Sequence, residues 1–123
     1  MREYEFTIIT KSDLPETDKA KLLEGYENIL KRGGGEVLKR EEWGTKRMTY
    51  PIKKQFRGSY VFYDLTSTAP DIEEAERLLR LDDNILRYLV VKIDDDVNIE
   101  DRKAALIKAA AQLQQQQEAH HHH

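Results

Sequence analysis

Two β-strands joined by a basic connection are predicted by residues Trp43–Leu65, which read WGTKRMTYPIKKQFRGSYVFYDL. The second half, Ser59–Leu65, is dense in aromatic and β-branched residues, which suit a half-buried strand. The first half is basic: the window Lys39–Arg57 holds seven cations and two anions in a chain whose net charge is −3. Residues Ile52–Arg57 are expected to form a hairpin loop too long for a two-residue turn. Its cations suit a polyanion such as nucleic acid, although lysines also keep solvated hairpins soluble and unpaired.

Outward from this hairpin, hydrophobic periodicity predicts two further strands and two helices. The expected elements are, in order, strand 3–9, helix 15–32, strand 36–50, strand 58–65, helix 70–81 and strand 86–93. The strand 36–50 is long, which predicts a bulge near Trp43–Gly44. This β-α-β-β-α-β order predicts a ferredoxin-like α+β fold, a four-stranded antiparallel sheet with two helices on one face.

The third strand is apolar on both sides, although the helices cover only one face of the sheet. Val61, Tyr63 and Leu65 alternate with Tyr60 and Phe62. An open face that carries aromatic residues predicts a protein partner, so Tyr60 and Phe62 are the predicted partner-binding residues. A tryptophan near a strand bend more often packs than stacks on a ligand, so Trp43 is expected to pack.

Composition limits the classes of protein. The 123 residues contain no cysteine, and all four histidines lie at the C-terminus. They indicate a tag remnant over 118–123. No apolar stretch approaches the roughly 20 residues that span a bilayer, and the charged start does not resemble a signal peptide, so we expect a cytoplasmic protein. A pI near 5.8 argues against a uniformly basic nucleic-acid binder but permits a local basic face.

The C-terminal extension, 94–117, differs in character from the domain expected over 1–93. Residues Asp94–Asp96 lack the spaced ligand loop of calcium sites, and no metal site is predicted. From the plausible N-cap Asn98, the segment to Gln117 has helix-forming composition and a thin apolar stripe. Such a helix is marginal alone, so we expect a helical or disordered tail that adds little to thermal stability.

Several runs resemble the S6 family of bacterial small-subunit ribosomal proteins. The first is Gly44–Lys53, GTKRMTYPIK, followed at a short interval by Gly58 and the YVFY of 60–63. The opening MREYE of 1–5 and the later LDDNILRYLVVK of 81–92 resemble the family's start and its fourth-strand region. Met48 and Thr49 depart from the family's commoner residues, but both are tolerated in a strand. The resemblance covers about residues 1–93.

The resemblance implies a structural constituent of the small ribosomal subunit. Such a protein binds the central domain of small-subunit ribosomal RNA as a heterodimer with ribosomal protein S18, without cofactor or small-molecule substrate. Its cations meet phosphates and the minor groove mainly by charge and shape. The predicted RNA-binding residues are the hairpin cations Lys46, Arg47, Lys53, Lys54 and Arg57, followed by Arg2, Arg87 and Lys92 on neighbouring strands.

Three other classes were weighed from the residues. An enzyme is improbable because the chain has no cysteine nucleophile and no histidine base outside the expected tag. An RNA-recognition module that stacks bases on its sheet is disfavoured because Arg57–Phe62, RGSYVF, only partly matches that signature. The remaining alternative is a ligand-binding or regulatory domain that dimerises through its open sheet face.

Overall fold

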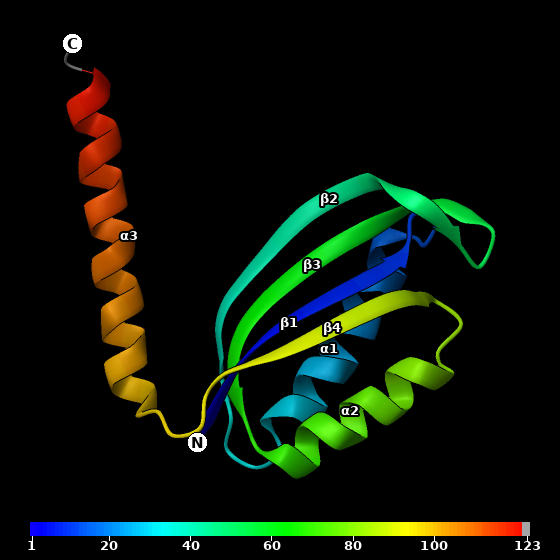
Figure 1. Ribbon diagram of the computed structural model, residues 1–123, viewed down its shortest axis with the longest axis horizontal. Coiled ribbons are helices and arrows are strands. Elements are labelled where there is room, and N and C mark those ends of the chain that lie inside the picture. The colour runs from blue at the N-terminus through cyan, green and yellow to red at the C-terminus, as the bar shows by residue number, and fades with distance from the viewer. Residues whose placement is uncertain (122–123) are drawn as a thin grey trace.

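The computed structural model describes the backbone of residues 1–121 and the side chains of residues 1–115. The elements are β1 (Arg2–Lys11), α1 (Glu16–Lys31), β2 (Val37–Ile52), β3 (Gln55–Ser67), α2 (Ala69–Leu81), β4 (Ile85–Asp94) and α3 (Ile99–His121). The antiparallel sheet has the strand order β2-β3-β1-β4. Helices α1 and α2 cover one face (Figure 1), so the predicted ferredoxin-like fold is confirmed. The side chains of the predicted tag remnant, 118–123, lie outside the described residues.

The hydrophobic core lies between the sheet and the two helices. Phe6, Ile8 and Val61 project from β1 and β3 and are fully buried against Leu23 of α1 and Leu79 of α2. The period of two in the strands and the amphipathic pattern in the helices produce this layer. The other half of each strand's side chains therefore lies on the face that α1 and α2 leave open.

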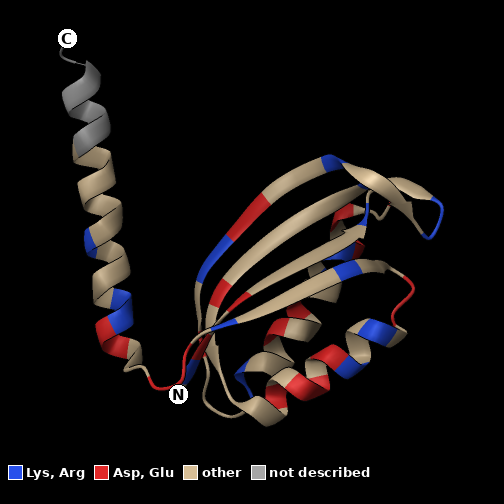
Figure 2. Cartoon of the chain, in the orientation of Figure 1, with Lys and Arg blue, Asp and Glu red and all other residues tan. Residues whose placement is uncertain are grey.

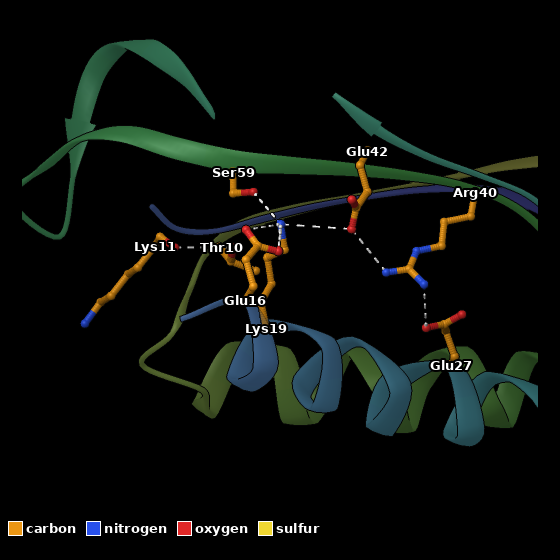
Figure 3. Close-up of polar contacts among 8 residues, drawn as sticks. All are labelled: Thr10, Lys11, Glu16, Lys19, Glu27, Arg40, Glu42 and Ser59. Carbon is orange, nitrogen blue, oxygen red and sulfur yellow. Dashed lines mark hydrogen bonds and ion pairs between the residues drawn. The ribbon is translucent and has the colours of Figure 1, made fainter. Parts of the chain in front are cut away.

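A chain of polar contacts fixes β2 and β3 against α1 (Figure 3). The buried Lys19 Nζ donates to Ser59 Oγ at 3.3 Å and lies 4.0 Å from Glu42 Oε1. Arg40 continues the chain, donating to Glu42 at 3.3 Å and lying 3.9 Å from Glu27 of α1. A buried ammonium is stable only with partners of this kind. The bridge restrains the first half of β2, the strand that leads into the basic hairpin.

The hairpin between β2 and β3 is tighter than the sequence indicated. The predicted bulge is confirmed, because the register shifts between Glu42 and Gly44, and Gly44 has a φ of +77°. The predicted long loop is wrong, since Ile52 pairs with Gln55 and only two residues turn. Lys53 and Lys54 have φ values of +50° and +64°, the pattern of a type I′ turn. Two lysines lack the Asn-Gly signal that normally marks this turn.

The tail helix α3 is tied to the sheet at its first turn. Asn98 caps it as predicted, its Oδ1 accepting from Asp101 N at 3.1 Å. Arg102 donates two hydrogen bonds, at 2.6 and 3.0 Å, to the carboxylate of Glu3. Glu3 is only 2% exposed. The rest of α3 extends away from the sheet (Figure 1). The prediction that the tail adds little to thermal stability is untested, and this contact argues against it, because a buried carboxylate has its partner on the tail.

Asp64 lies beside the Glu3–Arg102 pair and gives the fold a pH dependence. Burial, with Glu3 nearby, raises the pKa of Asp64 from 3.8 to about 7. Its Oδ1 is buried and, among the described residues, has no hydrogen-bond partner. Between pH of about 4 and about 7 the folded state therefore binds more protons here than the unfolded state does. The contribution of Asp64 to stability falls as pH rises through that window.

We expect Asp64→Asn to remove this loss of stability with rising pH, because the side-chain amide is neutral at every pH. The Tm of the variant relative to the parent chain is expected to rise between pH 4 and pH 7 and to stay constant above it. Thermal unfolding in matched buffers checks the prediction. A difference in Tm that does not change with pH would contradict the raised pKa.

Candidate nucleic-acid and partner interface

Five of the predicted cations gather where the β2–β3 hairpin meets the end of the sheet: Lys46, Arg47, Lys54, Arg57 and Arg87. Arg47 lies opposite Arg57 across the β2–β3 ladder, and Arg87 of β4 pairs with Ile9 at the same end of β1. Figure 2 shows basic residues on this hairpin tip and on the adjoining part of β4. The fold thus joins cations from three strand segments at one end of the molecule.

Within this group, the pair of Arg47 and Arg57 is the strongest indication of a surface that binds an anion. Both side chains are exposed, and they face each other on neighbouring strands. Like charges directly opposite one another destabilise a sheet. Within the described part of the chain, neither arginine lies within ion-pair distance of a carboxylate. This end of the molecule therefore has positive charge available for an external anion.

Lys46 connects the cationic end with the open sheet face. Its ammonium lies 5.1 Å from the centroid of the Trp43 ring and 5.8 Å from that of Tyr60. These are cation–π distances, which hold the side chain over the aromatic residues. Lys46 therefore borders both the basic hairpin and the aromatic surface.

Lys53 is in a different environment from the other hairpin cations. Its Nζ donates to Ile85 O at 2.9 Å and to Asp82 O at 3.4 Å. The residue faces the turn between α2 and β4, where the helix ends. The prediction that Lys53 contacts RNA directly is untested, and this geometry gives its ammonium two protein acceptors.

Arg2 and Lys92 do not join the hairpin group. Arg2 pairs with Ser67 and Lys92 with Tyr4, whereas the hairpin end of β1 is Lys11, opposite Gly58. The ten residues of β1 from Arg2 to Lys11 separate the two ends by about 30 Å. Lys92 also forms an ion pair with Asp95 at 2.7 Å. Their assignment as RNA-binding residues remains a prediction for a second, distant surface.

The open sheet face carries an apolar surface that is larger than the sequence analysis indicated. The predicted partner residues Tyr60 and Phe62 lie on it but are half-buried, and Trp43 stacks on Phe62 with ring centroids 5.4 Å apart. Packing of Trp43 is thus confirmed, yet its side chain is 44% exposed. The exposed aliphatic residues of this face, which the analysis missed, come from β4: Leu89, Val91 and Ile93. We define these three residues with Trp43, Tyr60 and Phe62 as the open-face surface.

Alternation along β4 was the signal that could have located these residues. Tyr88 and Val90 pack against the core, so their neighbours in a strand must face the other way. Leu89 pairs with Thr7 and Val91 with Glu5, on the side away from the helices. Both faces of β4 carry apolar side chains, but α1 and α2 pack against only one of them. The other face is therefore available to a partner.

Two aromatic residues stand on the hairpin itself. Tyr50 is 78% exposed and Phe56 is also exposed. Neither ring belongs to the predicted RNA-binding residues, and Pro51 biases the backbone of the preceding Tyr50 toward an extended form. Exposed aromatic rings between cations suit contact with RNA bases, although no sequence motif marks either residue.

The described residues give no support for a metal site or for a membrane-spanning helix. They contain no group of three His, Cys, Asp or Glu side chains arranged to hold a metal ion. Within the same residues, no helix combines the length and the apolar character needed to cross a membrane. The features above define a class of protein: a small ferredoxin-like α+β domain with one cationic and one apolar surface suited to macromolecular partners.

Comparison with known proteins narrows this class to one family. Residues 3–92 match the family described as Ribosomal protein S6. The small ribosomal subunit protein bS6 of Caldanaerobacter subterraneus subsp. tengcongensis is 37% identical over 95 residues, covering 77% of this chain and 100% of that protein. The bS6 of Desulfatibacillum aliphaticivorans is 35% identical over 109 residues, which are 89% of this chain and 59% of that protein.

A solved structure agrees with these relatives. The crystal structure of 30S ribosomal protein S6 from Thermotoga maritima matches with a TM-score of 0.67 and 27% identity, covering 89% of this chain and 97% of that one. The chain therefore belongs to the ribosomal protein S6 family. The relatives are named as ribosomal proteins and not as enzymes, which confirms the predicted family, the predicted non-enzymatic role and the predicted ribosomal location.

Proposed function

We propose that this protein helps to build the small ribosomal subunit by binding small-subunit ribosomal RNA, in its central domain, together with ribosomal protein S18. The observation that supports RNA binding most directly is the Arg47–Arg57 pair, two exposed like charges side by side without a carboxylate partner in the described residues. RNA phosphates supply the missing anions, and counterion release makes such binding sensitive to salt.

The open-face surface supports the second half of the proposal. Leu89 is 57% exposed and alternates along β4 with Tyr88 and Val90, which pack against the core. The apolar residues of the surface lie on both sides of β1, whose Glu5 and Thr7 stand between them on the same face. Exposed apolar surface marks protein interaction sites. The cationic hairpin end and the open-face surface meet at Lys46 and Tyr60. A partner seated on the sheet can therefore contact the same RNA as the hairpin, which makes RNA binding depend on the heterodimer.

Replacing Lys54 and Arg57 together by alanine tests the RNA surface. Both side chains are exposed, so folding should be unchanged. We expect RNA binding by the heterodimer to weaken and the slope of log K against log salt concentration to fall by about one to two units. Titrations between low and physiological salt measure that slope.

A matched control removes the same charge elsewhere. Lys31 and Arg32 are exposed at the C-terminal end of α1, which leads into the start of β2 and lies at the other end of the sheet from the hairpin. Their double alanine variant is expected to keep the parent slope. Equal changes of slope in the two double variants would show that the RNA surface is not the hairpin end.

A further inference from the structure

The β2–β3 turn is attached to a second turn that lies far away in the sequence. Lys53 Nζ donates to the carbonyl oxygens of Asp82 and Ile85, 29 and 32 residues along the chain. Asp82 is the C-cap of α2, where helix carbonyls lack partners within the helix and the helix dipole is negative. An ammonium is the natural partner for such a position. The contact is a polar clamp between the hairpin and the α2–β4 turn.

An apolar contact supports the same arrangement. Met48 of β2 is buried with Ile9 and Leu86, and Ile52 and Tyr60 pack against this small cluster. The ladder between β2 and β3 is interrupted between Arg47 and Ile52, so hydrogen bonds to β3 do not by themselves fix this part of the hairpin. Its direction depends on the Met48 cluster and on the Lys53 clamp.

We propose that Lys53 is a positioning residue for RNA recognition, an inference that rests on the proposed function. Its ammonium holds the hairpin turn against the start of β4. Lys54, Arg57 and Arg87 then present one cationic surface to the RNA backbone. Lys53 contributes through the placement of its neighbours, because two protein carbonyls occupy two of the three donors of its ammonium.

Lys54 is a matched neighbour for testing this role. It also has a positive φ, it is also exposed, and within the described residues it forms no hydrogen bond or ion pair. Methionine in place of either lysine keeps an unbranched side chain and removes the charge and the donors. In the free protein, Lys53→Met and Lys54→Met therefore differ in the clamp alone.

The experiment measures thermal unfolding and the affinity of the S18 heterodimer for a central-domain ribosomal RNA fragment at fixed salt. Lys53→Met is expected to lower Tm by about 4 °C through loss of the clamp, and Lys54→Met is not. Lys53→Met is also expected to weaken RNA binding about fivefold in the parent chain but less than about twofold in a Lys54→Met/Arg57→Met background, because the clamp then has fewer hairpin cations to position. Lys53→Arg, which keeps the donors, should restore both quantities.

Two results overturn the positioning role while leaving the proposed function in place. One is an unchanged Tm with the same fold-loss of RNA affinity in both backgrounds, which indicates a direct phosphate contact. The other is a lowered Tm with unchanged RNA affinity, which indicates a purely structural clamp. Absence of RNA binding by the unmodified heterodimer overturns the proposed function and the positioning role together.

Discussion

Replacing Leu89 by glutamate is expected to weaken S18 binding by about 100-fold, because a charge without a partner would be buried in the interface proposed for S18. Leu89 is 57% exposed in the free protein and lies on β4 within the open-face surface. The substitution therefore places glutamate in water when the chain is alone, and the fold should be unaffected. Calorimetric titration with purified S18 measures the loss, and circular dichroism verifies the fold.

The control for this prediction uses the same substitution on the opposite layer. Leu81 at the end of α2 is 71% exposed, so Leu81→Glu has the same change of charge and a similar cost to the free chain. Its affinity for S18 should equal that of the parent protein. If Leu81→Glu abolished binding and Leu89→Glu did not, the partner surface would lie on the helices and not on the sheet.

Replacing Arg102 by alanine is expected to lower the free energy of unfolding by about 2–3 kcal/mol, since it leaves a buried carboxylate without its partner. Glu3 accepts both hydrogen bonds of this pair, and Asp64 Oδ2 lies 3.8 Å from the same guanidinium. Two neighbouring carboxylates would then share a site without a cation. Chemical denaturation at neutral pH measures the loss.

Lys103 offers the comparison for Arg102. It forms an ion pair with Glu36 in which both side chains are substantially exposed, and exposed pairs contribute within about 1 kcal/mol. Lys103→Ala is therefore expected to change stability little, although it is the next residue of the same helix. Adding Glu3→Gln to Arg102→Ala should recover part of the loss. Equal stabilities for Arg102→Ala and the parent chain would show that α3 is not anchored to the sheet.

The fold was predictable because its signals are local. Alternation along Glu3–Ile9 and Ser59–Leu65, the charged ends of α1 and the glycine in the middle of β2 all indicate their own elements. The order of those elements then restricts the topology to very few arrangements. The bulge at Gly44 was predictable for the same reason, because a sixteen-residue strand with an internal glycine rarely continues unbroken.

The features that the sequence did not reveal depend on contacts between distant residues. The Arg102–Glu3 pair joins residues 99 positions apart, and neither residue type signals burial. Lys53 appeared as one of several cations until its position over the end of α2 distinguished it from Lys54. Alternation along β4 separates Leu89 from Tyr88 and Val90, but the pairing of β4 with β1 shows that Leu89 lies on the face that the helices leave open. Charge could therefore locate the hairpin surface, but not which of its cations are free.

The most direct test of the central claim is a titration of a central-domain small-subunit RNA fragment with this protein, with and without S18, over a range of salt concentrations. The account predicts weak binding by the single chain, whose net charge is −3, and tight, salt-sensitive binding when S18 is present. Equally tight and specific binding by the chain alone, or no binding in the presence of S18, would contradict it.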